Sequence, residues 1–191
     1  MKLVAGLGNP GARYADTRHN VGFMAVERLA RHGGIALKKK GYQGIYGVGR
    51  VAGREVTALL PQTFMNLSGV SIGSAIKSLG LDPGDLIVVH DDIDLPFGIV
   101  RIRTGGGHGG HNGIRNICEV LGGGDFIRVK LGVGRPPGEA QAAGHVLRGF
   151  AAAERTKLDN VLTNSVEVLE VLLAKGVKQA MNEFNNRDIS T

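Results

Sequence analysis

The chain has 191 residues, of which 42% are hydrophobic and 21% charged, an ordinary composition for a globular protein. This length suits one domain with a substantial core, so we predict a single domain over residues 1–191. The single cysteine excludes an internal disulfide and fits a reducing compartment. No apolar run approaches the roughly 20 residues of a transmembrane helix, and the first residues lack the apolar core of a signal peptide. We therefore expect a cytoplasmic protein that does not enter a membrane.

The basic residues are concentrated in the first 150 positions. From Ala151 onward there are 5 Lys or Arg and 6 Asp or Glu, so the first 150 residues carry +7 within a total of +6. A basic body with a near-neutral tail suits a polyanionic partner, although solubility alone explains the charge equally well. Glycine is also enriched: its 31 residues are about twice the usual ~7%.

Short β-branched runs alternate with helical patterns along the chain, which is typical of an α/β fold. The patterns predict strands at residues 2–7, 45–51, 55–60, 86–90, 99–103 and 126–133, and helices at residues 21–31, 67–79, 112–121 and 151–174. Asn20 is the expected N-cap of the first helix. Because some strands adjoin along the chain while helices separate others, we predict one twisted mixed β-sheet with helices on both faces.

The first strand is followed by a glycine pattern. Gly6, Gly8 and Gly11 spell the G-x-G-x-x-G of dinucleotide sites. Such a site requires a helix to open within the pattern, whereas Pro10 and about ten further residues precede the helix here. No acidic residue ends a second strand to bind a ribose. A turn that places Asn9 at the carboxyl edge of the strand, where α/β sheets bind ligands, therefore explains the glycines better than a nicotinamide site.

His19 and Asp91 are candidates for acid–base chemistry. His19 directly precedes the first predicted helix, and the positive end of a helix dipole disfavours imidazolium, so the ring can act as a neutral base. Asp91 follows an apolar strand, and its carboxylate could accept the imidazole N–H and stabilise the imidazolium formed in catalysis. Alternation along the strand puts His90, Asp92 and Asp94 on the opposite side, where a divalent metal remains an alternative.

The densest glycine cluster spans residues 105–113, in which six of nine positions are glycine. Such a segment fits a backbone that closely follows a ligand, or a flexible loop. Asn112 could cap the following helix or donate to an ester carbonyl. His108 and His111 could bind zinc, but no cysteine or third nearby histidine completes a site.

A polar segment at residues 61–69 follows another strand. Phe64, Met65 and Asn66 in this segment could line a pocket, although the core explains the first two equally well. The sequence has no nucleophile elbow and no P-loop, and Cys118 lies in an apolar helical stretch. Direct attack by base-activated water is therefore the simplest hydrolytic scheme.

Five of these segments together resemble the bacterial peptidyl-tRNA hydrolase family in order and spacing. They are residues 6–11, 17–22, 64–69, 90–96 and 106–113. The resemblance extends over essentially the whole chain. It implies a hydrolase that cuts the ester between a peptide and the 3′-terminal ribose of tRNA, and so recycles tRNA from peptidyl-tRNA released by ribosomes. It also implies that no cofactor and no metal is needed.

The resemblance assigns roles by position. His19 is the implied general base and Asp91 its partner, while Asn9 helps to distinguish peptidyl from free aminoacyl groups. The implied contacts with the peptide, the tRNA acceptor end and the tRNA phosphates are Tyr14, Phe64, Met65, Asn66, His111, Asn112, Arg103 and Lys130. Asparagine amides suit a site that reads the peptide backbone, since each offers donors and an acceptor. The implied partner is peptidyl-tRNA, bound by a monomer with no obligate protein partner.

Two other functions remain to be distinguished. The first is a metal-dependent phosphodiesterase or nuclease built on His90, Asp92, Asp94 and His111. The second is a non-catalytic RNA-binding module that uses the basic body of the protein. An aromatic content of 5% with no tryptophan weakens a module based on base stacking.

Overall fold

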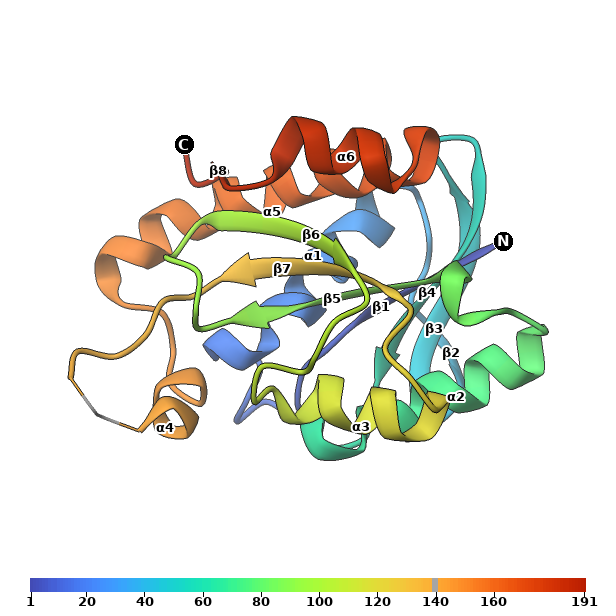
Figure 1. Ribbon diagram of the computed structural model, residues 1–191, viewed down its shortest axis with the longest axis horizontal. Helices are drawn as coiled ribbons and strands as arrows, with labels where there is room; N and C mark the ends of the chain where they lie inside the picture. Colours follow the sequence, from blue (N-terminus) through green and yellow to red (C-terminus); the bar gives the residue numbers. More distant parts are fainter. Residues whose placement is uncertain (139–140) are drawn as a thin grey trace.

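Over residues 1–138 and 141–191, which the computed structural model describes, the chain forms an eight-stranded mixed β-sheet with helices on both faces (Figure 1). The strands are β1 (Lys2–Gly6), β2 (Lys39–Gly41), β3 (Gly44–Val51), β4 (Arg54–Pro61), β5 (Leu86–Asp92), β6 (Ile99–Thr104), β7 (Ile127–Gly132) and β8 (Arg187–Asp188). Their order is β2-β3-β4-β1-β5-β7-β6-β8. The central strands β4, β1, β5 and β7 are parallel, and antiparallel strands flank them on both sides.

Apart from α4, the helices lie in two layers. The helices are α1 (Val21–His32), α2 (Ser68–Leu79), α3 (Asn112–Leu121), α4 (Ala142–Val146), α5 (Ala152–Lys175) and α6 (Val177–Phe184), with single 3₁₀ turns at Arg18–Asn20, Met65–Leu67 and Pro83–Asp85. Helices α1, α5 and α6 cover one face of the sheet, and α2 and α3 pack together on the other (Figure 1). None of the described helices has both the length and the apolar character that crossing a bilayer requires.

Alternate residues of the central strands supply two separate cores. Val4 of β1 belongs to the core beneath α1 and α5. Its neighbours Leu3 and Ala5 belong to the opposite core, together with Ile72 of α2 and Ile114 of α3. This period of two, with both faces of each central strand buried, is what a parallel sheet covered by two helical layers requires. The predicted mixed sheet with helices on both faces is confirmed.

Helix α1 approaches the sheet more closely than a side chain would allow. A Cβ atom at Gly22 would lie 2.3 Å from the main-chain oxygen of Val89, and one at Gly6 would lie 2.3 Å from the oxygen of Gly22. Glycine at both positions permits direct backbone packing. The amide of Leu7 donates to the oxygen of Val89 at 3.0 Å, and that of Phe23 to the oxygen of Leu7 at 3.2 Å. These contacts fix the start of α1 above the carboxyl ends of β1 and β5.

The structure adds four short elements that the sequence patterns did not predict: β2, α4, α6 and β8. Strands of two or three residues are too short to show a period. The capping predictions need correction. Asn20 occupies the N-cap position of α1 but makes no capping hydrogen bond, and His111 caps α3, whereas Asn112 is the first residue of that helix.

Candidate active site

A cleft of about 700 Å³ opens where β1, β5 and β7 end at their carboxyl termini. The predicted site residues that line it are Asn9, His19, Phe64, Met65, Asn66, Asp91, Arg103, His111, Asn112 and Lys130. Tyr14 is outside the lining, but its ring meets Phe64 edge-on, with ring centroids 6.5 Å apart. Sequence segments that are far apart along the chain therefore meet at one edge of the sheet, the edge where open α/β sheets bind ligands.

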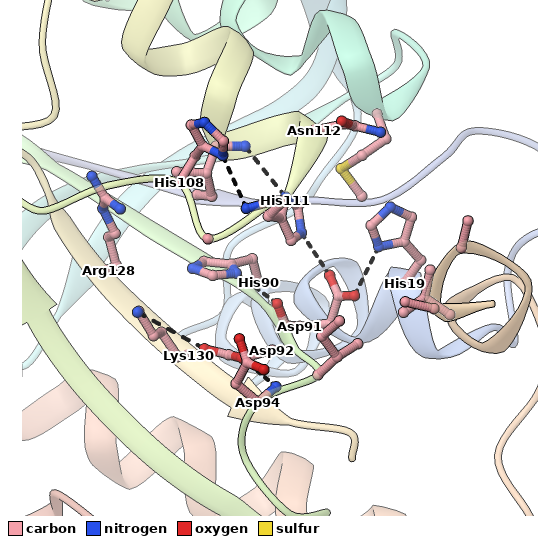
Figure 2. A pocket seen from close by; sticks show the side chains of 18 of the residues that line it. His19, His90, Asp91, Asp92, Asp94, His108, His111, Asn112, Arg128 and Lys130 are labelled. Atoms are coloured by element: carbon pink, nitrogen blue, oxygen red, sulfur yellow. Dashed lines mark hydrogen bonds and ion pairs between the residues drawn. The ribbon is translucent and has the colours of Figure 1, made fainter. Parts of the chain in front are cut away.

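The centre of the cleft is a histidine–aspartate pair. The Nδ1 atom of His19 lies 2.8 Å from Oδ2 of Asp91, and the carboxylate, at the end of β5, is 2% exposed (Figure 2). An ionised carboxylate can only accept a hydrogen bond, so Nδ1 carries the proton. When the ring is neutral, its lone pair is therefore on Nε2, which Figure 2 shows on the side of the ring turned away from Asp91. The predicted juxtaposition of His19 and Asp91 is observed.

A second imidazole binds the other oxygen of the same carboxylate. Nε2 of His111 lies 2.8 Å from Oδ1 of Asp91, so that His19 and His111 lie on either side of it (Figure 2). Burial raises the pKa of Asp91, but the electrostatic and hydrogen-bonding interactions with His19 and His111 outweigh burial and hold the pKa well below its usual range. Asp91 is consequently ionised at neutral pH.

His111 is fixed in one tautomer. Its Nδ1 atom accepts from the backbone amides of Gly113 at 3.1 Å and Ile114 at 3.3 Å, which makes the ring the N-cap of α3. Because Nδ1 is an acceptor and Nε2 donates to Asp91, the ring is neutral and both of its nitrogens are occupied within the protein. His111 was expected to contact the substrate directly, but neither of its ring nitrogens is free to form a hydrogen bond with a substrate.

His90 adds a third imidazole that carries no charge. Its Nδ1 atom donates to the main-chain oxygen of Asp91 at 2.7 Å, and its ring packs edge-on against His111, with centroids 4.9 Å apart. Burial lowers the pKa of His90 to about 3, and the adjacent His111 contributes to that shift. Its Nε2 atom is buried without a hydrogen-bond partner in the part of the chain that the structure describes.

Asn9 is held by both backbone and side chain. The side-chain amide of Asn20 accepts from the Asn9 backbone amide at 2.9 Å and donates to its main-chain oxygen at 2.9 Å. The Oδ1 atom of Asn9 accepts from the backbone amide of Met65 at 2.7 Å. This orients the side chain so that its NH₂ group is what Asn9 offers to the cleft. Asn20 therefore serves to position Asn9 instead of capping α1.

The other end of the cleft is basic. The side chains there belong to neighbouring strands and are Arg101 and Arg103 of β6 with Arg128 and Lys130 of β7. Burial lowers the pKa of Lys130, which the carboxylate of Asp92, 3.8 Å away, partly offsets. The sequence analysis missed Arg101 and Arg128, although each stands two residues from a predicted phosphate contact and so faces the same side of its strand.

Helix α4 forms a wall that the sequence analysis also missed. Val146 and Leu147 line the cleft, and the buried Arg18 holds this segment, donating to the main-chain oxygen of His145 at 3.1 Å. The same guanidinium pairs with Glu154 at 3.0 Å. Because Arg18 immediately precedes His19, the α4 wall and the histidine share one anchor.

The side chains proposed for the alternative metal site do not come together around one point. Asp92 faces Lys130, Asp94 pairs with Arg135, and His111 binds Asp91. Among the described residues, the cluster that could ligate an ion is His19, Asp91 and His111, whose ligating atoms lie within 4.8 Å of one another. Those same atoms hold the hydrogen bonds described above. Three of the four residues of the metal-dependent phosphodiesterase hypothesis, Asp92, Asp94 and His111, are thus engaged elsewhere.

Taken together, the α/β fold and a cleft built around an imidazole hydrogen-bonded to a buried carboxylate are typical of hydrolytic enzymes that activate water. A sequence model of the family described as peptidyl-tRNA hydrolase matches residues 3–191. The chain belongs to the peptidyl-tRNA hydrolase family. This confirms the predicted family and its enzyme class, a hydrolase of ester bonds.

Relatives and solved structures agree with this assignment. The chain is 59% identical over 187 residues to the peptidyl-tRNA hydrolase of Syntrophotalea carbinolica, covering 98% of each chain. It is 46% identical over 189 residues to that of Geotalea daltonii, covering 99% of this chain and 98% of the relative. The crystal structure of the peptidyl-tRNA hydrolase of Acinetobacter baumannii superposes with a TM-score of 0.92 at 40% identity, covering 100% of this chain and 97% of that one.

Proposed function

We propose that the protein releases peptides from peptidyl-tRNA by direct hydrolysis, with His19 as the general base. The observation that carries this proposal is the 2.8 Å contact between Nδ1 of His19 and the buried carboxylate of Asp91, which makes Nε2 the basic nitrogen of the neutral ring at the cleft. Nε2 removes a proton from water, and the resulting hydroxide attacks the ester carbonyl carbon. As the tetrahedral intermediate collapses, the imidazolium returns the proton to the departing ribose oxygen.

The proton taken from water belongs on His19 alone. Protonation of His111 would remove the acceptor that caps α3, and the pKa of His90 is held at about 3. Asp91 stays ionised and stabilises the imidazolium of His19 by charge and by hydrogen bonding. The two imidazoles on Asp91 therefore have different tasks: His19 moves the proton, and His111 holds the carboxylate.

Amide groups supply the contacts that a varied peptide needs. Asn9 presents its NH₂ group to the cleft, and Asn66 and Asn112 line the same space. Such donors can bind the carbonyl oxygens of any peptide and can stabilise the oxyanion that develops during attack. Met65 packs beside them as the apolar contact for the peptide.

The basic end of the cleft is the proposed binding region for tRNA phosphates. Arg103 and Lys130 lie there, while Phe64, with Tyr14 behind it, is 59% exposed and available to the acceptor end. Phosphate contacts hold RNA without reading its sequence, which suits an enzyme that acts on many tRNAs. The proposal includes a monomeric enzyme located in the cytoplasm, where its substrate arises during translation.

The test is hydrolysis of N-acetyl-aminoacyl-tRNA by His19→Ala, compared with the parent and with His32→Ala. His32 is an exposed histidine that binds Glu170 at the opposite end of α1, so its loss is a matched control. We expect His19→Ala to lose about 10²–10⁴-fold or more in kcat while it still binds tRNA. His32→Ala should keep parental activity, and a chelator should leave the parent active.

Near-parental turnover by His19→Ala would remove this histidine from the mechanism. Tight tRNA binding by the parent without release of the N-acetyl-amino acid would favour the RNA-binding module. Loss of activity on chelation, restored by a divalent cation, would favour metal-dependent chemistry.

A further inference from the structure

One buried cation has no role in the mechanism above. Arg128 is the second residue of β7, is 1% exposed, and is the largest of the fully buried side chains within the described part of the chain. In residues 1–138 and 141–191 no carboxylate lies within ion-pair distance of it. A buried charge without a counter-ion is costly, and burial lowers the pKa of Arg128. We therefore asked which contacts of the guanidinium group offset this cost.

Main-chain carbonyl oxygens on both sides of α3 accept hydrogen bonds from Nη1 and Nη2 of the guanidinium, whereas its Nε is buried without a hydrogen-bond partner among the described residues. The guanidinium donates to Gly106 at 2.8 Å and Gly107 at 2.5 Å, in the loop before the helix, and to Gly124 at 3.2 Å, in the turn after it. It also lies over the ring of Phe126, with 4.6 Å between Cζ and the ring centroid. One planar group with several diverging donors thus ties the loop before α3 to the turn after α3.

The glycines around this guanidinium group leave space that a larger residue would fill. A Cβ atom at Gly124 would lie 2.8 Å from Nη2 of Arg128 and 2.8 Å from the oxygen of Gly106. Gly106 has φ +93°, and a Cβ atom there would lie 2.5 Å from Cζ of Arg103. The loop is therefore held between the buried Arg128 and the guanidinium of Arg103, which lines the cleft.

The held loop leads directly into the catalytic centre. His111 follows it and both caps α3 and binds Asp91, and Asn112 is the first residue of the helix. In Figure 2, His111 and His90 lie between Arg128 and the His19–Asp91 pair. Any shift of the loop would therefore move the imidazole that fixes Asp91 and, through Asp91, the base.

We propose that Arg128 is a positioning residue for the hydrolysis: by binding the carbonyl groups of Gly106, Gly107 and Gly124, it sets the loop that places His111 and Asn112 at the cleft. This inference rests on the proposed function and deepens it. Lysine at this position would keep the charge but offer one donor centre in place of the planar group, so the loop would lose part of its support.

The experiment compares two perturbations of the same contact with two controls. Arg128→Lys weakens the donors, and Gly124→Ala leaves Arg128 intact while it crowds the guanidinium and the oxygen of Gly106. Gly123→Ala is the matched glycine control, because a Cβ atom there meets no other atom within 4 Å. Arg54→Lys is the matched arginine control, since Arg54 donates to the main-chain oxygen of Leu173, away from the cleft. Each variant is measured for kcat, KM and Tm on N-acetyl-aminoacyl-tRNA.

We expect Arg128→Lys and Gly124→Ala each to lower kcat on the order of 10- to 100-fold at temperatures well below their Tm, with smaller changes in KM. Because both act on one contact, the double variant should lose less than the product of the two single losses. Both controls should keep parental kcat.

Parental kcat in the two test variants, with only Tm lowered, would overturn the inference and leave Arg128 a purely stabilising residue. If Arg128→Lys does not fold, Gly124→Ala decides by itself, because it retains the arginine. Failure of this inference can be distinguished from failure of the proposed function. If His19→Ala is inactive while Gly124→Ala is fully active, only the positioning role of Arg128 is refuted.

Discussion

At the residue scale, the site depends on one carboxylate that accepts from two imidazoles. Both oxygens of Asp91 are used, and the partner on one side, His111, cannot change its tautomer without losing the cap of α3. An amide at position 91 would offer one acceptor and one donor. The donor would conflict with one imidazole N–H, and His19 is the ring free to respond. The base would then present the wrong tautomer to water.

The first prediction follows from this conflict. Asp91→Asn should lower kcat about 10²–10⁴-fold with little change in the affinity for tRNA. Steady-state hydrolysis and a separate tRNA-binding assay measure the two effects. Asp159→Asn, on the exposed face of α5, is the matched control and should behave as the parent. Equal kcat for Asp91→Asn and the parent would contradict the assigned role.

The second prediction concerns acid stability. The pKa of His90 is about 3 in the folded protein, against about 6.5 in an unfolded chain. Between these values the unfolded state binds a proton that the folded state does not, so the free energy of unfolding falls as pH drops from about 6.5 toward 3. His90→Asn, which cannot take up this proton, should lose less Tm between pH 7.5 and 5. His32→Asn, at an exposed site, should follow the parent, and equal slopes for all three would contradict the assignment.

At the element scale, the approach of α1 to the sheet sets the position of the base. The third prediction is that Gly22→Ala lowers kcat at least tenfold and destabilises the fold by about 1–3 kcal/mol. The reason is that the added methyl would lie 2.3 Å from the oxygen of Val89, so α1 must move and carry His19 away from Asp91. Gly84→Ala introduces the same methyl into open space and is the control. Enzyme kinetics and thermal unfolding check both effects.

The elements that sequence reasoning predicted well are those with a long, regular pattern. β1, β5, β7, α1 and α5 all show runs of buried residues at the period of their structure, and their predicted bounds lie within two residues of the observed ones. Elements α4 and β8 have 5 and 2 residues, fewer than a pattern needs to be recognised. Tertiary contacts define them: β8, for example, exists because it pairs with β6.

The site was predictable where chemistry follows from residue type and sequence position. His19 before a helix and Asp91 after a strand were identified from the sequence, and the structure brings them into contact. From the sequence, Asn112 was expected either to cap α3 or to bind the substrate, and His111 was not considered as the cap. Asparagine is a frequent N-cap residue, whereas histidine is not. The tie between Arg128 and the glycine loop could not be predicted, since it depends on main-chain oxygens about 20 residues away in sequence.

At the scale of the whole molecule, the charge distribution separates binding from chemistry. The basic side chains at the cleft end come from β6 and β7, whereas the C-terminal 41 residues carry −1. The fourth prediction is that Arg103→Ala raises KM and reduces the slope of log KM against log salt by about one, because one phosphate contact is lost. Lys178→Ala on the exposed face of α6 should leave both quantities unchanged. An unaltered KM for Arg103→Ala would contradict the phosphate contact.

The central strand β1 joins the two halves of the chain, because it pairs with β4 on one side and with β5 on the other. Helix α2 ends at Leu79, and Gly80 follows in an exposed left-handed turn. A polypeptide cut at this turn would leave Asn9 and His19 on one fragment and Asp91 and His111 on the other. Neither fragment alone would hold a working base, so release of peptide from tRNA would report reassembly of the two pieces. The fold thus offers a split-enzyme sensor whose signal comes from catalysis itself.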